Sequence, residues 1–69
     1  MELNRDAIFI RLAELQINRK QLAERSGLNY VVCCEALSKG EASPITVGKL
    51  AQGLNIEVDR IAKAKEVPR

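Results

Sequence analysis

The sequence has no histidine, no tryptophan and only two cysteines, and each scarcity narrows what the chain can do. Without histidine, the commonest general base near neutral pH and the commonest metal ligand are both missing. Cys33 and Cys34 are neighbours, which rarely bridge within one chain and do not make a tetrahedral metal site. We interpret them as one core thiol and one half-exposed thiol rather than a redox switch. We therefore expect no disulfide, no metal, no cofactor and no enzymatic activity.

Long apolar runs are also absent, because no stretch approaches the roughly 18 residues of a membrane span. No signal peptide is visible, and free thiols without a targeting segment predict a cytoplasmic protein that does not enter a membrane. The 69 residues are 46% hydrophobic and 29% charged, which is typical of one small globular domain over residues 1–69. We expect no appended effector domain, and a solvated tail over residues 66–69. A core this small usually needs support, and a partner chain is the support we expect.

The net charge of +2 is concentrated in the middle of the chain. Between Asn18 and Gly40 there are four basic and two acidic residues, whereas the rest of the chain carries seven of each sign. So small an excess fits an ordinary solvated face as well as a nucleic-acid site. Charge alone leaves both interpretations open.

Helical periodicity runs through the chain without evident strand alternation, so we predict an all-α fold of five short helices. Their predicted ranges are Arg5–Leu15, Arg19–Ser26, Tyr30–Ser38, Pro44–Leu54 and Val58–Lys65. Residues suited to N-capping precede the first four helices, namely Asn4, Asn18, Asn29 and Ser43. Gly27, Gly40 and Asn55, which tolerate positive φ, follow the second, third and fourth helices.

Apolar residues recur on one face of each predicted helix, and these faces form the predicted core. The residues predicted to face inward are Ile8, Phe9, Leu12, Leu15, Leu22, Ala23, Leu28, Cys33, Ala36, Leu37, Ile45, Val47, Leu50, Ala51, Leu54 and Ile61. Ile10 lies off the stripe of the first helix and is predicted to be exposed. For Ile10, Ile56, Val58 and Ile61, a place in the core and a seam between two copies both remain open.

The most informative unit is the second helix, the turn after it and the third helix, residues 18–38. Ala23, Gly27 and Cys33 are spaced four and six residues apart in this unit. Two helices that cross steeply need a small residue at the crossing and a turn residue that tolerates positive φ. They also need an apolar side chain that points back into the joint. The three residues meet these needs in that order.

With these residues the sequence resembles the helix-turn-helix family of phage Cro proteins and lambdoid repressors, often called the xenobiotic-response-element type. The segments that carry the resemblance are Arg19–Asn29 and Ser43–Ile56, and it covers roughly residues 8–62. It implies a compact lambda-repressor-like domain whose third helix enters the major groove of double-stranded DNA, while the second lies across the backbone. It also implies a homodimer, which would supply the partner chain that the small core needs.

The resemblance also implies which residues contact DNA. Base contacts would come from the start of the third helix and its next turn: Asn29, Tyr30, Val31, Cys34 and Glu35. Phosphate contacts would come from Arg19, Lys20, Lys39, Ser43, Thr46 and Lys49.

The predicted reading surface departs from the family pattern. Tyr30–Cys34 is a run of apolar or weakly polar residues, without the Gln, Asn, Arg and Lys that usually read bases. Val31 suits a thymine methyl group, whereas Glu35 suits a cytosine amino group but repels phosphate. Arg19 stands where the family often has Gln, which favours phosphate contact over base reading.

We therefore predict a small transcriptional regulator that binds operator DNA, of the kind that phages and mobile elements encode. Two alternatives stay open. One is an antirepressor that binds another repressor through the apolar third helix, since an exposed apolar patch also suits a partner's groove. The other is the antitoxin of a toxin–antitoxin pair, which would bind both DNA and a toxin.

Overall fold

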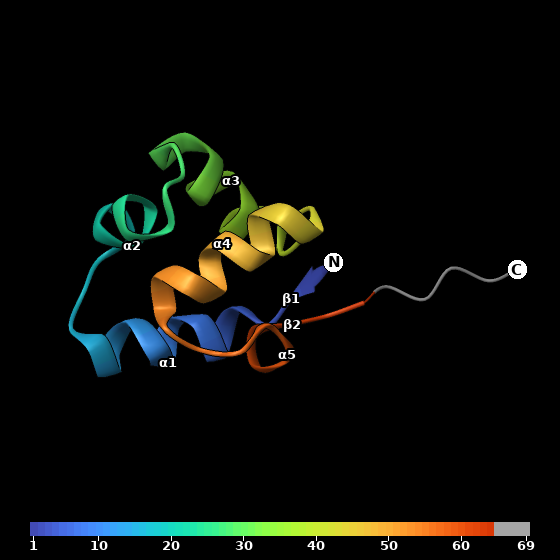
Figure 1. The fold of residues 1–69 in the computed structure, drawn as a ribbon, viewed down its shortest axis with the longest axis horizontal. Coiled ribbons are helices and arrows are strands. Elements are labelled where there is room, and N and C mark those ends of the chain that lie inside the picture. The colour runs from blue at the N-terminus through green and yellow to red at the C-terminus, as the bar shows by residue number, and fades with distance from the viewer. Residues whose placement is uncertain (65–69) are drawn as a thin grey trace, which may run out of the picture.

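The computed structural model describes residues 1–64, and this part of the chain is mostly helical (Figure 1). Its five helices are α1 (Arg5–Leu15), α2 (Arg19–Ser26), α3 (Tyr30–Lys39), α4 (Pro44–Leu54) and α5 (Val58–Ile61). Two short strands lie at either end of this series, β1 (Glu2–Leu3) and β2 (Ala62–Lys63). The predicted all-α class and the first four helices are confirmed, with α3 one residue longer than predicted. Within residues 1–64, no helix has both the length and the apolar character that crossing a membrane requires.

The ends of the helices are set by residues next to them in sequence. The predicted N-caps of the first four helices, Asn4, Asn18, Asn29 and Ser43, all accept a backbone hydrogen bond from the following turn. In α2 the cap is reciprocal: Asn18 Oδ1 accepts from Gln21 N–H at 2.8 Å, and Gln21 Oε1 accepts from Asn18 N–H at 2.9 Å. Gly27, Gly40 and Asn55 end their helices in the left-handed conformation, as predicted.

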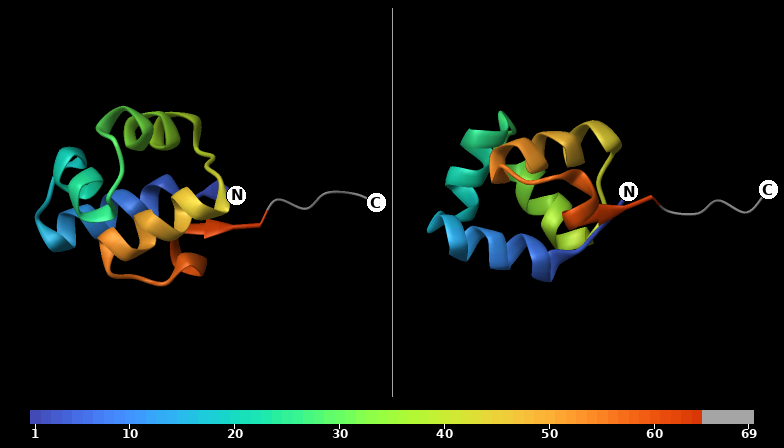
Figure 2. Two further views of the ribbon diagram at one scale, coloured as in Figure 1. Left: turned by 45° about the horizontal axis from the view of Figure 1, so that its top comes forward. Right: turned by 60° about the horizontal axis from the view of Figure 1, so that its bottom comes forward.

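Helix α4 is the central element of the fold. It contacts α1, α2 and α5, while α3 packs chiefly on α2 (Figure 2). The core between these helices consists of Leu3, Ile8, Leu12, Leu22, Ala23, Cys33, Ala36, Leu37, Val47, Leu50, Ala51, Leu54, Ile61 and Ala62. Most residues predicted to face inward are among them, and the partly buried Leu15 and Leu28 pack against them.

Two apolar side chains predicted to face inward are exposed instead. Phe9 is 46% exposed and Ile45 is 75% exposed. Neighbouring residues of a helix point about 100° apart, so the stripe that buries Ile8 turns Phe9 towards solvent. In α4, the first fully buried position belongs to Val47 rather than Ile45.

Four residues could have belonged either to the core or to a dimer interface: Ile10, Ile56, Val58 and Ile61. The structure places them in different environments. Ile61 is fully buried and Ile10 is 62% exposed, as predicted for Ile10. Ile56 and Val58 are half-buried against the core. Only Ile10 of this group therefore offers a largely free apolar side chain.

The predicted last helix, Val58–Lys65, is wrong at its C-terminal end, and two short strands that the sequence did not predict accompany the helices. Helix α5 ends at Ile61, and β2 then pairs antiparallel with β1. Two-residue strands are too short to show the alternation that marks a strand in sequence. Their pairing joins opposite ends of the described chain, which no local pattern reveals. Lys65 and the predicted tail over residues 66–69 lie outside the described residues.

Helices α2 and α4 approach each other closely at Ser26 and Gly53. A Cβ atom added to Gly53 would overlap Ser26 Oγ and lie 3.1 Å from Ser26 N. Glycine is therefore the residue that permits this backbone approach. The Ser26 hydroxyl is buried there and has no hydrogen-bond partner among residues 1–64.

Two arginines bind the carbonyl groups at the C-terminal end of α4. Arg25 Nε donates to Gly53 O at 2.8 Å, and Arg11 donates to Leu54 O at 2.9 Å and to Asn55 O at 3.2 Å. The last carbonyls of a helix have no partner within it and carry its negative dipole end, so both interactions are favourable. They tie α1 and α2 to the same end of the central helix.

We expect Gly53→Ala to lower the free energy of unfolding by about 1–3 kcal/mol, because the added methyl group overpacks the α2–α4 contact. The matched control is Gly48→Ala in the same helix, where an added Cβ meets no atom within 4 Å. This control should raise stability by up to about 1 kcal/mol, since alanine favours helix more than glycine does. Urea titrations followed by far-ultraviolet circular dichroism measure both effects, and equal effects would contradict the packing described here.

Candidate functional site

A tight turn over residues 27–29 joins α2 to α3. Gly27 has φ of +69°, and Leu28 N–H donates to Ala23 O at 2.9 Å, which reverses the chain direction at the end of α2. Asn29 Oδ1 then accepts from Val31 N–H at 2.8 Å and begins α3. The turn is therefore as short as it can be: Gly27 ends α2, Asn29 caps α3, and only Leu28 lies between them.

Small side chains fill the joint between α2 and α3. Ala23 is 2% exposed and Cys33 is fully buried, as the spacing of these residues predicted. Ala36 and Leu37 complete the inner face of α3. Because these positions face inward, the remaining side of α3 is left to solvent.

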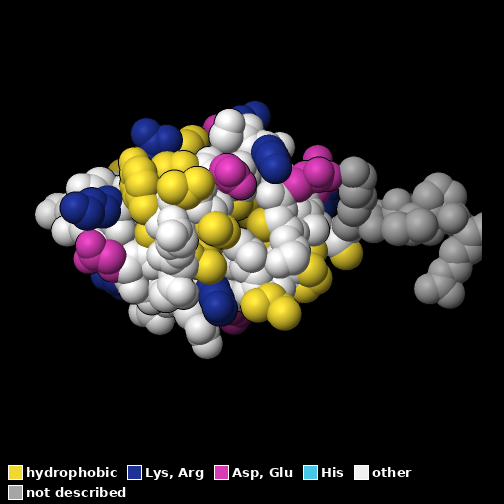
Figure 3. All heavy atoms as spheres, turned by 90° about the horizontal axis from the view of Figure 1, so that it is seen from above, with side chains coloured by type: hydrophobic (Ala, Val, Ile, Leu, Met, Phe, Trp, Pro, Cys, Tyr) yellow, Lys and Arg dark blue, Asp and Glu magenta, His cyan; other side chains and the backbone are white. Residues whose placement is uncertain are grey.

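The exposed side of α3 begins with an apolar patch made of Tyr30, Val31 and Val32, which we call the α3 patch. Their exposed fractions are 48%, 60% and 42%. Figure 3 shows apolar side chains gathered over the start of α3, with basic and acidic side chains around them. The prediction of DNA-contacting residues left out Val32, although the Tyr-Val-Val run was the signal that would have included it.

Two basic side chains are exposed at the start of α2, the helix on which α3 packs. Arg19 and Lys20 are exposed, and the first turn of α2 contains no acidic residue. The free N–H groups of a helix start carry its positive dipole end, which adds to these two charges. This corner of the molecule therefore suits an anion.

Two groups of α3, Tyr30 and Cys33, have raised pKa values, and the charge of Arg19 opposes both shifts. A side-chain hydrogen bond with Cys34 raises the pKa of the Tyr30 hydroxyl above its ordinary value of 10.0, and Arg19 opposes this shift. Burial raises the pKa of the Cys33 thiol, with a further contribution from Cys34, and Arg19 again opposes it. Both thiols of the vicinal pair are free, Cys33 buried and Cys34 half-buried, which confirms their predicted environments.

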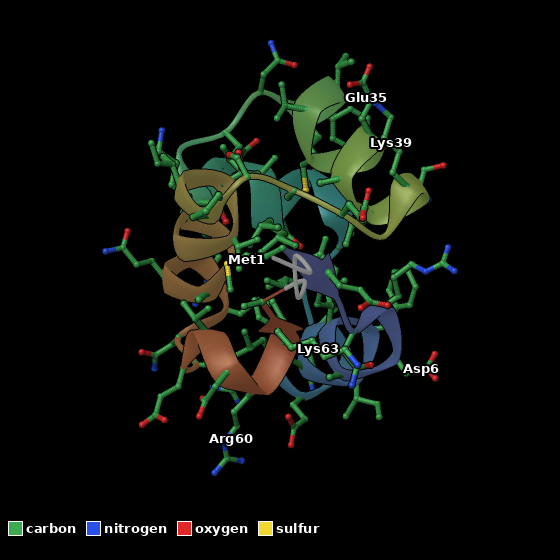
Figure 4. All side chains as sticks on the ribbon, turned by 90° about the vertical axis from the view of Figure 1, so that its right-hand side faces the viewer. Met1, Asp6, Glu35, Lys39, Arg60 and Lys63 are labelled. Carbon is green, nitrogen blue, oxygen red and sulfur yellow. The ribbon has the colours of Figure 1, made fainter. Side chains whose placement is uncertain are left out.

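The other predicted contact residues lie along α3 and at the start of α4. Glu35 and Lys39 are exposed on α3, at the opposite end of the molecule from Arg60 (Figure 4). Lys49 is exposed on α4, and Thr46 is half-buried. The predicted contact residues are thus distributed over the start of α2, the length of α3 and the first half of α4.

Three of the predicted contact residues already have structural partners. The Asn29 side chain caps α3. Ser43 Oγ accepts from Thr46 N–H at 3.3 Å and donates to Thr46 Oγ1 at 3.1 Å. The amide of Asn29 is therefore partly committed to holding the helix start, which reduces what it can offer a base edge.

Two hollows lie near the surface, and the first borders this unit. It is lined by Arg5, Asp6 and Phe9 of α1 and by Arg19, Leu37 and Ser38 of the unit. The other lies beside the two strands and is lined by residues of both charge signs, including Asp6 and Arg60. Within residues 1–64, no three His, Cys, Asp or Glu side chains are grouped so that they could hold a metal ion.

Comparison of the chain with protein-family models, curated proteins and solved structures found no match.

We expect Cys34, and not Cys33, to react with a thiol reagent in the folded protein, because Cys33 is buried and its pKa is raised. Mass spectrometry after brief alkylation should find one adduct in the native protein and two after denaturation. Rapid double labelling of the native protein would contradict this.

The same buried thiol predicts loss of stability at alkaline pH. The pKa of Cys33 is higher in the folded than in the unfolded chain. The buried thiol therefore contributes fully to the free energy of unfolding when the pH is below its pKa in the unfolded chain. Stability then falls as the pH rises through about 9 towards the folded value. In Cys33→Val, where no thiol titrates, thermal unfolding between pH 8 and pH 10 should show a smaller loss.

Proposed function

We propose that this chain is a small transcriptional regulator that binds operator DNA, with α2 and α3 acting as a helix-turn-helix. In this proposal α3 enters the major groove of double-stranded DNA, and α2 lies across the phosphate backbone. Its main support is the arrangement of the unit: α3 packs on α2, and the basic start of α2 and the outer side of α3 are both exposed. The protein would act in the cytoplasm, as the product of a phage or mobile element.

The charges of the unit support contact with the DNA backbone. Arg25 is partly engaged within the protein, because its Nε donates to Gly53 O at 2.8 Å. Phosphate binding would therefore depend mainly on Arg19 and Lys20, which start α2, and on Lys39 at the end of α3. Ser43, Thr46 and Lys49 would add contacts from the start of α4.

We propose a homodimer on a two-fold operator as part of the same function. One α3 helix with few hydrogen-bonding groups offers limited affinity for a half-site. Two linked copies convert the second contact into an intramolecular one and raise the overall affinity. Sedimentation of the protein with and without DNA measures this stoichiometry.

A second candidate function follows from the α3 patch itself. Three consecutive exposed apolar residues at the start of a helix also suit the groove of a protein partner. In that case the chain would be an antirepressor that binds another repressor, or an antitoxin that binds a toxin as well as DNA. Binding to a co-encoded repressor without any DNA binding favours the antirepressor, and binding to both DNA and a neighbouring toxin favours the antitoxin.

We expect Arg19→Ala with Lys20→Ala to weaken binding to DNA from the protein's own promoter region. Each lost phosphate contact should also reduce the slope of log affinity against log salt by about 0.9. Fluorescence anisotropy at several salt concentrations measures affinity and slope together. The matched control is Arg60→Ala with Lys63→Ala, because both residues are exposed on the α5 side, away from α3 (Figure 4).

The control pair should bind nearly as the unmodified chain does. Equal losses in the two double variants would mean that binding depends on total charge and not on the start of α2. No binding to any promoter DNA, together with tight binding to a co-encoded repressor, would overturn the proposed function.

We expect Glu35→Gln to strengthen binding to unrelated DNA. The ratio of the affinity for operator DNA to that for unrelated DNA should become smaller. The carboxylate repels phosphates wherever the protein binds, but accepts a hydrogen bond only where a cytosine amino group faces it. Competition between labelled operator and an excess of unrelated duplex reports both effects. If the variant keeps the same ratio of operator to unrelated affinity, Glu35 does not contribute to base reading.

A further inference from the structure

We propose that α3 reads the C5-methyl groups of pyrimidines in the major groove, above all those of thymine, through the α3 patch with Val31 at its centre. This inference rests on the proposed function and names what the same surface recognises. It assigns specificity to apolar contact instead of to the paired hydrogen bonds that most base-reading side chains make.

The start of α3 has few polar groups, and one of them is engaged within the protein. Asn29 Oδ1 accepts from Val31 N–H at 2.8 Å as the helix cap. Tyr30 and Cys34 lie one turn apart on α3, and Cys34 is half-buried. Two valine side chains then make up the rest of the first turn, so apolar atoms dominate what this turn can offer a base edge.

The major groove offers one apolar group among the four natural bases. Its floor carries hydrogen-bond donors and acceptors together with the methyl group of thymine, and its walls are lined with phosphates. The α3 patch has the complementary layout. Apolar side chains begin α3, Arg19 and Lys20 are exposed at the start of the neighbouring α2, and no acidic residue occurs in the first turn of either helix. The cations distinguish this surface from a purely apolar docking face and favour a polyanion as its occupant.

Val31 is the residue best placed to contact a methyl group. It is the most exposed member of the patch, at 60%. A β-branched side chain in a helix has one strongly preferred rotamer, so little conformational freedom is lost on contact. Glu35 lies one turn further along the same side of α3 and would accept a hydrogen bond from a cytosine amino group. A helical turn of about 5.4 Å spans one to two base pairs, so the preferred site should hold a thymine and a cytosine at about that spacing.

The test begins with selection of bound sequences from a random-sequence duplex library by the full chain. The selected duplex is then synthesised with uracil in place of each thymine in turn, which removes one methyl group and leaves the base pairing intact. At the contacted positions we expect affinity to fall about fourfold per methyl group. The salt dependence should stay unchanged, because the phosphate contacts remain.

Two variants assign the effect to the patch. Val31→Ala should bind the thymine and uracil duplexes equally. Ile10→Ala removes a side chain of similar exposure, 62% against 60% for Val31, but on α1. It should keep the full preference for thymine. A cytosine next to the contacted positions, with and without a 5-methyl group, shows whether the patch accepts this methyl group from either pyrimidine.

The outcomes separate this inference from the function on which it rests. Sequence-dependent binding that is indifferent to uracil at every position would overturn methyl reading and leave DNA binding intact. A preference for thymine that survives in Val31→Ala would overturn the role of the patch. The absence of any enriched or bound DNA would overturn both, and capture of a co-encoded repressor that Val31→Ala abolishes would then assign the patch to a protein partner.

Discussion

The close approach of α2 and α4 at Ser26 and Gly53 is the constraint on which the rest of the structure depends. Helix α3 packs chiefly on α2, so its position follows from how α2 lies on the central helix. Glycine permits the contact, and Arg25 holds the end of α4 to α2 from the other side of the joint. The core is small, and a shift of α2 along α4 would therefore move the whole candidate surface.

The candidate surface combines features that usually occur apart. Basic residues and a helix N-terminus favour a polyanion, whereas Tyr30, Val31 and Val32 favour an apolar partner. These features conflict if the surface is taken as a general hydrogen-bonding reader of bases. They agree if phosphates supply the affinity and methyl groups supply the discrimination. With affinity and discrimination supplied in this way, the few polar groups of α3 are not needed to read bases and can instead stabilise the helix.

Local signals made most of the fold predictable from sequence. Asn18 and Gly27 set the ends of α2 through contacts within a few residues, and the same is true of α3 and α4. The exposure of Phe9 and Ile45 could not be predicted in this way, because it depends on which side of a helix meets its neighbours. The pairing of β1 with β2 was missed for a related reason, since it joins segments from opposite ends of the described chain.

The candidate site was predictable in outline but not in its hydrogen bonding. The spacing from Ala23 to Cys33 predicted a small, closed joint, and both residues are buried. The sequence marked Asn29 and Ser43 both as caps and as DNA contacts. Local pattern cannot decide between the two uses, because the choice depends on where the side-chain oxygen points. The structure shows both side chains in their capping roles, while contact with DNA stays a prediction.

The local definition of α3 has a consequence for how such a surface can change. Its ends are set by Asn29 and Gly40, and its hold on the rest of the fold comes from Cys33, Ala36 and Leu37. Positions 31, 32 and 35 belong to neither set. Substitutions at these positions can therefore change the chemistry of the exposed surface without disturbing the helix that carries it.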